Sequence, residues 1–315
     1  MSASIAAASG TATTHALRPT FVGMLRGELF KITRQRSVWV ATILLAGLVC
    51  APNLIYLLAQ SVKDQLAIAP LEVLYTMMER DLAVVRAFGG FYLLVLAGLM
   101  VGQEYQLGTI RILLGRGVGR LHLLGAKALG LAIIALVVLA GALLLDAALA
   151  VVDLLLLDHS LSAFGALTAK FWGDAGWYVV TVVISMGATL LLGVAANVVG
   201  RSLAFGLGVS LVWFPADNIG AEVLALVAAF TNNTFWLKVG SFLLGPQLNV
   251  LPALVVPARL ITIAGGKTAS EPASTLGFTP LVDITSTYSL LVILGYCVVF
   301  AAVATILTWR RDVLE

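Results

Sequence analysis

One stretch of the sequence has the residue types of a phosphate-binding loop but not the spacing. Gly265-Gly266-Lys267-Thr268 would supply the glycine, lysine and hydroxyl group that hold nucleotide phosphates. The full pattern, G-x-x-x-x-G-K-[ST], needs another glycine at position 261, where the chain has Ile261. No Ser/His/Asp grouping or HExxH motif occurs elsewhere. We therefore expect no catalytic and no cofactor-binding residues in this chain.

Five acidic residues near the ends of apolar runs bear on a second kind of chemistry, ion coupling. Carboxylates buried in the middle of a bilayer indicate an ion or proton pathway. Counted along ideal helices from the ends that carry Lys and Arg, these acids fall ~24 Å or more away, near the opposite surface. We expect them to be exposed or interfacial, forming either a solvated rim or an acidic mouth: Asp146, Asp153, Asp217, Glu222 and Asp283.

Cysteine and histidine form no ligand pattern. Cys50 and Cys297 lie in separate apolar runs, where a disulfide is not expected. The three histidines are scattered at His15, His122 and His159. The sequence therefore predicts no metal site.

Composition sets the fold class. Hydrophobic residues make up 60% of the chain and charged residues 11%, whereas soluble domains contain about 25% charged residues. We predict an all-α integral membrane protein. Its net charge of +3 is no evidence for nucleic-acid binding; the positions of the basic residues matter instead.

Six apolar runs are long enough to cross a hydrocarbon core of ~30 Å as helices. In the second, Gly98 and Gly102 form a GxxxG pattern that permits close helix packing. In the fifth, Pro215 leaves open whether the helix continues or breaks and resumes as a separate outer element. The expected spans are Val38–Ala59, Ala87–Val101, Ala128–Leu157, Gly173–Val199, Leu203–Phe230 and Ser286–Trp309.

The segments outside these spans have distinct compositions. Residues 1–19 read as a disordered arm, and residues 20–311 as a single domain. Residues 61–86 and 231–285 are predicted to be outer segments. In the first, we expect Pro70 to begin a short amphipathic helix whose buried side carries Leu74, Met77, Met78 and Leu82. The second, rich in Pro, Gly, Ser and Thr, holds apolar pieces too short to span, which we interpret as re-entrant or interfacial.

Residues 20–36 are predicted to form an amphipathic helix on the membrane surface. Its apolar residues recur with helical spacing, and Glu28 and Lys31, one turn apart, are expected to pair. A charged lead-in to the first span is the alternative. The apolar residues are Phe21, Met24, Leu25, Leu29 and Ile32.

A cationic, glycine-punctuated island occupies residues 102–127, between the second and third spans. Glu104, Gly108 and Arg111 follow i, i+4, i+7 spacing, which would place them on one helix face. A solvated loop needs no apolar residues, yet the island contains Ile110 and Leu113. This combination favours a short amphipathic helix docked against a partner; a purely structural surface helix is the alternative.

The distribution of basic residues orients the chain. If both termini lie in the cytosol, 12 of the 19 Lys and Arg residues lie inside. The positive-inside rule favours this topology. The island then faces the cytosol.

At these residues the sequence resembles the membrane subunit of bacterial type-2 ABC transporters, the ABC-2 permeases. Members carry an elbow helix with a Glu and nearby basic residues, matched here by Glu28, Lys31, Arg34 and Arg36. They also carry an E-x-x-x-G-T-x-R-x-L-L stretch followed by a basic segment. The matching residues are Glu104, Gly108, Thr109, Arg111, Leu113, Leu114, Arg116, Arg120 and Lys127.

The resemblance implies a function. Two permease subunits, either identical or related, would pair in the bacterial inner membrane and dock separate cytosolic ATPases, which carry the ATP and Mg²⁺. The island would supply the coupling helix, with Glu104 and Arg111 holding it at the end of span two, and transport would run in the direction of export. The alternatives are a self-contained secondary carrier or channel, and a membrane-embedded enzyme. The transported substrate is left open.

Overall fold

The computed structural model describes residues 20–57, 60–115, 117–255 and 285–310. These residues form helices and connecting turns, with no strand among them, and six of the helical segments are long and apolar enough to cross a membrane. The predicted all-α, six-span membrane fold is therefore confirmed. The arm at residues 1–19, the Gly265–Thr268 stretch and Asp283 lie outside the described residues.

The six candidate spans begin and end close to the predicted positions, with one exception described below. They are Arg36–Ile55, Pro70–Gln106, Arg120–Asp158, Ala169–Gly200, Leu203–Thr231 and Ser286–Arg310. In chain order the elements are α1 (Phe21–Arg34), α2 (Arg36–Leu57), α3 (Gln60–Ile68), α4 (Pro70–Ala97), η1 (Gly98–Gly102), α5 (Gln103–Gln106), α6 (Thr109–Gly115), α7 (Arg120–Asp158), η2 (Ser162–Ala166), α8 (Ala169–Gly200), α9 (Leu203–Thr231), α10 (Phe235–Gly240), α11 (Leu244–Val255) and α12 (Ser286–Arg310).

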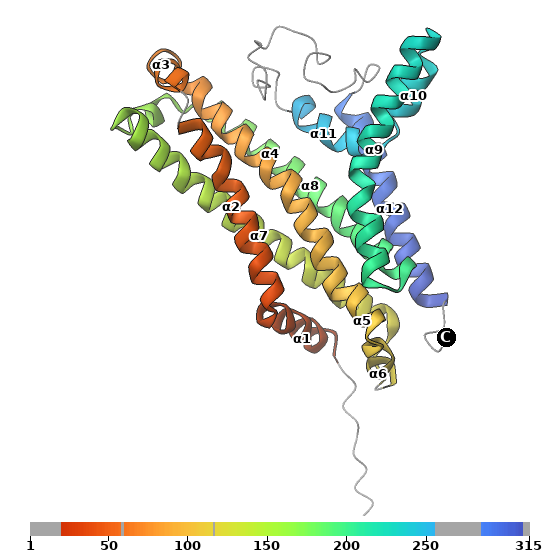
Figure 1. Cartoon of the computed structure of the whole chain (residues 1–315). Coiled ribbons are helices and arrows are strands. Elements are labelled where there is room, and N and C mark those ends of the chain that lie inside the picture. The colour runs from red at the N-terminus through yellow and green to blue at the C-terminus, as the bar shows by residue number, and fades with distance from the viewer. Residues whose placement is uncertain (1–19, 58–59, 116, 256–284, 311–315) are drawn as a thin grey trace, which may run out of the picture.

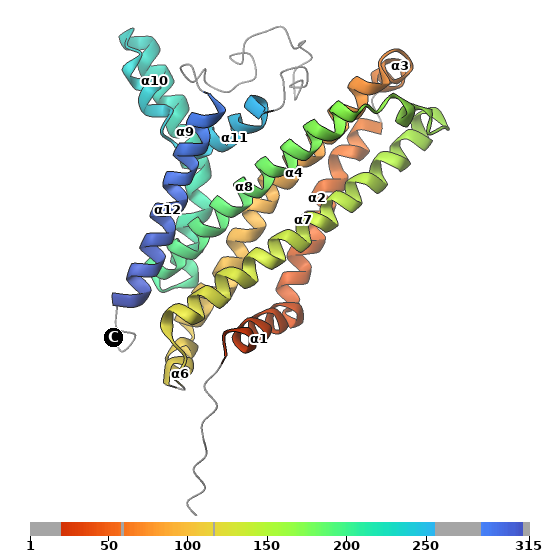
Figure 2. The same cartoon turned by 180° about the vertical axis from the view of Figure 1, so that it is seen from behind.

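The helices form two arms that meet at one end and diverge toward the other. Helices α2, α4, α7 and α8 run obliquely side by side, while α9 and α12 stand at an angle to them (Figures 1 and 2). Helix α8 packs against α4 in one arm and against α9 and α12 in the other. We call the end that carries α1 and α6 the α6 end, and the opposite one the α3 end.

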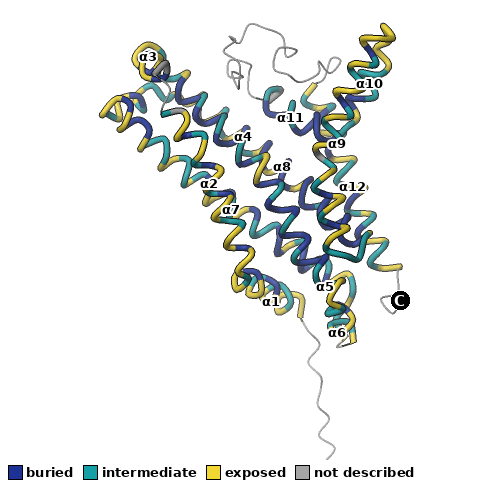
Figure 3. Tube along the Cα trace, viewed as in Figure 1, coloured by how far each residue is buried: buried dark blue, intermediate teal, exposed yellow. Residues whose placement is uncertain are grey.

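Burial follows this arrangement. Helices α4 and α8 are buried along much of their length, whereas α2, α7 and α9 expose many apolar side chains (Figure 3). Apolar side chains facing outward are expected where lipid replaces water as the solvent. The two central helices therefore form the core of the bundle.

The second span differs from the prediction. We expected a short outer helix from Pro70 and a separate span at Ala87–Val101, extended back to include Leu82–Val85. Instead, one helical segment runs from Pro70 to Gln106. Its charged residues are held by neighbouring helices instead of water, as described below, so no break is needed. The predicted buried residues are confirmed: Leu74, Met77, Met78 and Leu82.

The fifth span, for which a break at Pro215 was left open, is continuous. Helix α9 continues from Leu203 to Thr231 with Pro215 inside it. A proline removes one backbone hydrogen bond, which a membrane helix tolerates when its neighbours support it. The short helices α10 and α11 then follow; α10 packs against α9, and α11 packs against α8, α9 and α12.

The GxxxG pattern lies where three helices come closest. The π-helical turn η1 covers Gly98–Gly102 and packs against α8 and α9. A methyl group on Gly98 would lie 2.7 Å from Leu207 Cδ2, and one on Gly102 would lie 2.9 Å from Leu203 Cα. Glycine is required at both positions because a side chain would push the helices apart.

Gly206 makes a similar approach from α9, which leads to a testable prediction. A methyl group there would overlap the buried Asn197 side chain and lie 2.9 Å from Asn197 Cα. Overpacking of this kind costs about 1–3 kcal/mol, so Gly206→Ala is expected to lower the free energy of unfolding. Denaturant titration of the purified protein in detergent measures this.

Gly208 provides the matched control. A methyl group there meets nothing within 4 Å, so Gly208→Ala is expected to gain up to about 1 kcal/mol of helix propensity. Equal effects of the two substitutions would contradict the packing argument.

Candidate functional site

Four charged side chains from three helices form a cluster at the α6 end, which we call the ionic cluster. Lys127 of α7 is only 2% exposed, and its Nζ lies 2.8 Å from Glu28 Oε1 of α1 and 2.8 Å from Glu104 Oε2 of α5. Lys31 of α1 pairs with the other oxygen of Glu104. Two positive and two negative charges thus offset one another, as buried charges require.

The π-helical turn contributes a backbone ligand to this cluster. The carbonyl of Met100, inside η1, accepts a hydrogen bond of 3.1 Å from Lys127 Nζ. Single π-turns inside α-helices frequently occur at functional sites, because they change the direction of backbone and side chains. The Lys127 ammonium group therefore has partners on α1, η1 and α5.

The predicted pairing of Glu28 with Lys31 is wrong. Glu28 is buried and pairs with Lys127, while Lys31 reaches Glu104. Glu28 is spaced by three or four residues from Leu25 and Ile32, so it lies on the apolar stripe that packs against α7. The spacing of Glu28 from Leu25 and Ile32 already indicates this buried position in the sequence.

The island does not form one continuous helix. Helix α5 ends at Gln106, and Gly108 has a φ of +66°, a conformation that glycine adopts without strain. Helix α6 starts at Thr109, whose Oγ1 donates to the carbonyl of Glu104. Glu104 and Arg111 therefore do not share a helix face, and the expectation from their spacing is wrong.

The other predicted coupling residues fall on two sides of α6 and at the start of α7. Leu113 and Leu114 are half-buried and Arg111 is exposed, next to Ile112, which is 60% exposed. Arg116 lies outside the described residues. The α5–α6 turn also exposes Leu107, at 66%. The island thus combines two exposed apolar residues, Leu107 and Ile112, which we call the tip, with the buried charges of the ionic cluster.

The elbow residues Arg34 and Arg36 are exposed at the same end. The Arg34 guanidinium lies 5.3 Å from the centre of the Phe30 ring. Trp39, at the start of α2, donates its indole N–H to the carbonyl of Thr33 over 2.9 Å. These contacts stabilise the sharp turn between α1 and α2.

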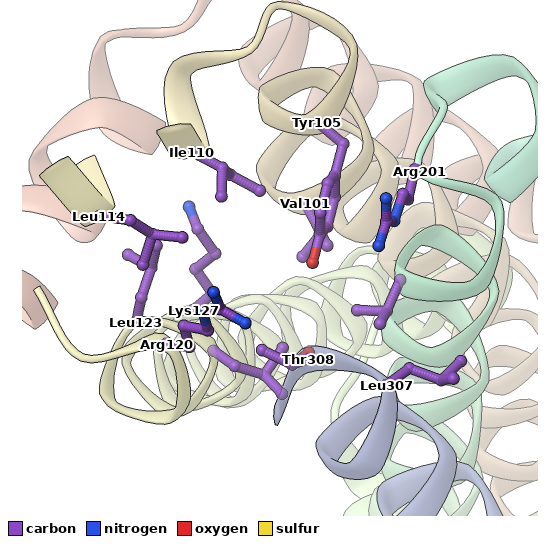
Figure 4. Close-up of a pocket in the computed structure, with 12 residues that line it drawn as sticks. Val101, Tyr105, Ile110, Leu114, Arg120, Leu123, Lys127, Arg201, Leu307 and Thr308 are labelled. Carbon is purple, nitrogen blue, oxygen red and sulfur yellow. The ribbon is translucent and has the colours of Figure 1, made fainter. Parts of the chain in front are cut away.

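A small cavity lies between α6 and the ends of the spans (Figure 4). It has a volume of about 30 Å³, enough for one or two water molecules. Arg120 and Lys127 of α7, Arg201 after α8 and Thr308 of α12 line it together with apolar residues. The predicted coupling residues Arg120 and Lys127 are therefore brought together, in a space too small for an organic substrate.

A second buried cluster, near the α3 end, contradicts the expectation that the acids there are solvated. Asp81 and Asn53 are each 2% exposed, and Asp153 is 1% exposed. Arg80 donates to both carboxylate oxygens of Asp81, over 2.8 and 3.0 Å, and also to Asn53. Asp146, half-buried, lies near Asp81 and the Arg80 guanidinium.

These acids are buried because α2, α4 and α7 pack against one another. An acidic mouth, one of the two alternatives for these residues, is not formed by the described acids: α7 carries Asp146 and Asp153, α9 carries Asp217 and Glu222, and the two helices diverge toward the α3 end (Figures 1 and 2). Asp217 instead accepts a hydrogen bond from the backbone of Gly245 at the start of α11.

Among the described residues, no group of three or more His, Cys, Asp and Glu side chains could hold a metal ion. Cys50 and Cys297 are free thiols, in agreement with the expectation that they do not pair.

Comparisons with known proteins agree with the geometry. Residues 24–313 match the family described as ABC-2 family transporter protein. Among curated proteins, none matches the chain closely enough for comparison. The family match covers all six spans and the ionic cluster. This multi-pass membrane protein therefore belongs to the ABC-2 transporter family, as a membrane permease component of ABC transporters.

Proposed function

We propose that this chain is the membrane subunit of an ATP-driven exporter in the bacterial inner membrane. Two subunits pair, as copies or as relatives, and each binds a separate cytosolic ATPase, which carries the ATP and Mg²⁺. The ionic cluster supports this proposal most strongly, because it joins the surface helix α1, the end of span two and the start of span three around one buried ammonium group.

In this proposal, the exposed tip of the island is the coupling element. Leu107 and Ile112 present apolar surface at the α6 end, where a groove on the ATPase would receive a short helix. A displacement of the tip by the ATPase would move Glu104, which is only a few residues away in the chain. The ion pairs of Lys127 with Glu104 and Glu28 would then transmit this displacement to α7 and α1. Paired buried charges transmit such a displacement because separating them is costly.

The orientation of the bundle follows from its charges. Lys31 and Arg34 lie on α1, Arg111 on α6 and Arg120 at the start of α7, all at the α6 end, and α12 ends at the same end of the bundle (Figure 1). Basic residues are retained on the cytosolic side. Both termini and the coupling element would then face the cytosol, where the ATPase is found.

Pairing of two subunits would use one of the outward apolar faces. Helix α9 is the least buried of the six spans. Its outward residues include Val212, Ile219 and Leu226, each more than half exposed. A second subunit could cover this face.

The substitution pair Leu107→Asp/Ile112→Asp tests the coupling role. Both side chains are exposed, so the variant is expected to fold and insert normally. Charged groups would prevent the tip from entering an apolar groove, and the ATPase that co-purifies with the wild type after mild crosslinking is expected to be lost, by at least tenfold. Size-exclusion chromatography and helix content check that the permease is intact.

Leu161→Asp is the control for a charge added to an exposed loop. Leu161 is 45% exposed between α7 and α8, at the α3 end, and its substitution is expected to leave ATPase recovery unchanged. Retention of the ATPase by the double variant would show that the tip is not the docking element. If no ATPase co-purifies even with the wild type, a self-contained carrier becomes the better explanation.

A further inference from the structure

A largely apolar cavity with a few polar groups lies between the two arms, away from the ionic cluster. Helices α4, α8, α9 and α11 line it, and its volume is about 250 Å³. One cation, Arg86, lies on its wall, together with hydroxyl and amide groups on three other helices: Ser185, Thr189, Asn218 and Asn249. The rest of the wall is formed largely by Ala87, Gly90, Phe91, Pro215 and Leu248.

The guanidinium of Arg86 is held in place by a backbone group that a proline leaves available. Pro252, inside α11, has no N–H to donate to the carbonyl four residues earlier, which is that of Leu248. Arg86 donates to this Leu248 carbonyl instead. A guanidinium has five N–H donors in a planar fork. One contact therefore orients the group and leaves further donors for a ligand in the cavity.

One acidic residue near Arg86 comes from its own helix: Glu79, two turns earlier on α4. Tyr178 of α8, a neutral phenol, donates to the backbone carbonyl of Glu79. Neither residue lines the cavity. A ligand in the cavity would therefore meet the guanidinium directly, with Glu79 and Tyr178 outside the cavity wall.

The position of Arg86 favours access from the far half of the membrane. It lies about 30 Å along the second span from Gln106 at the α6 end, at 1.5 Å per residue. A cation within a membrane-spanning helix is costly and typically marks a substrate or ion pathway. Planar N–H forks bind carboxylates and phosphates through two parallel hydrogen bonds.

We propose that this cavity binds the oxyanion headgroup, phosphate or carboxylate, of an amphipathic substrate. Arg86 binds the headgroup, and the apolar part lies along Ala87, Phe91 and Pro215. The Ser185 hydroxyl and the second amide N–H of Asn249 bind the remaining oxygens of the headgroup, because the Thr189 hydroxyl already donates to the Ser185 carbonyl and the first Asn249 N–H to Asn218. This inference rests on the proposed transport function and adds the chemical class of its substrate.

The test measures binding to the purified chain in nanodiscs of neutral phosphatidylcholine, without ATPase. Radiolabelled decyl phosphate is the probe, with empty nanodiscs subtracted. Unlabelled decyl phosphate and decanoate are expected to displace it, whereas decyltrimethylammonium and decanol are expected to be at least tenfold weaker competitors. Because no ATPase is present, failure here is distinct from a failure of ATPase docking.

Arg86→Gln is expected to weaken decyl phosphate binding at least tenfold. Ala87→Leu leaves Arg86 intact and places a larger side chain in the cavity. Because Ala87 is exposed, the substitution is expected to weaken binding at least fivefold without disturbing the fold. Lys170→Gln removes an exposed cation at the start of α8 and is expected to bind like the wild type.

Three results would overturn the inference. The first is a wild type that binds decyltrimethylammonium or decanol as well as decyl phosphate. The second is unchanged binding by both Arg86→Gln and Ala87→Leu. The third is displacement of the probe by inorganic phosphate at the same concentration as by decyl phosphate, which would show a site for free oxyanions instead of amphipathic ones.

Discussion

Replacing Lys127 by methionine is expected to destabilise the protein by about 3–5 kcal/mol, because it leaves the buried carboxylate of Glu28 without a cation. Methionine retains the apolar stem of lysine but loses the ammonium group that contacts Glu28, Glu104 and the Met100 carbonyl. Glu104 keeps Lys31, whereas Glu28 loses the cation that pairs with it. The effect is measured as a shift of the denaturant midpoint in detergent and as a lower yield of monodisperse protein.

A second substitution separates the electrostatic cost from lost packing. Glu28→Gln in the Lys127→Met background removes the stranded charge while keeping the shape of the side chain. The double variant is expected to be more stable than Lys127→Met alone. Arg26→Met, at an exposed position on the same helix as Glu28, is expected to stay within about 0.5 kcal/mol of the wild type. If Lys127→Met matched Arg26→Met, the ionic cluster would not hold the three helices together.

Replacing Arg80 by methionine is expected to have an effect of similar size at the other end. The guanidinium binds both oxygens of Asp81 and also contacts Asn53. Without it, the buried carboxyl groups of Asp81 and Asp153 and the half-buried one of Asp146 would share one space between α2, α4 and α7. Repulsion and desolvation are expected to cost about 3–5 kcal/mol and to loosen these three helices. Amide hydrogen exchange locates the loosening, and denaturant titration measures its size.

Here too a rescue variant distinguishes the causes. Asp81→Asn in the Arg80→Met background removes one carboxylate and is expected to restore part of the stability. Lys63→Met, at an exposed position on α3, serves as the surface control and is expected to be neutral. A uniform change of exchange over the whole bundle, with no focus on α2, α4 and α7, would contradict the local role of Arg80.

The class of the protein and the approximate position of its spans follow from composition and apolar run length alone. A chain with 60% hydrophobic and 11% charged residues can satisfy its backbone in a bilayer only through helices or a closed barrel. Each run of about 20 apolar residues then crosses once. The pattern at Glu104–Lys127 was sufficient to indicate the family, because these residues stand out from the apolar runs on either side.

Element boundaries were predictable only in part. Pro70 marks the start of α4, as expected, whereas Gly108, with a φ of +66°, ends a helix in a stretch whose spacing predicted one continuous helix face. Pro215 left open whether the fifth span breaks, because a proline lowers the stability of a helix but its neighbours decide whether the helix continues. The charged residues between Glu79 and Arg86 suggested solvent, yet they lie in the middle of a continuous helix.

Which charges meet was decided by the tertiary structure. Glu28 and Lys127 are 99 residues apart in the chain, and Arg86 and Leu248 are 162 apart. Helical periodicity states which face a residue occupies, but not which helix that face will contact. Glu28 therefore pairs with Lys127 and not with the nearby Lys31. Packing of α1 on α7 places the Glu28 carboxylate and the Lys127 ammonium group away from water, where an unpaired charge is far more costly than at the surface.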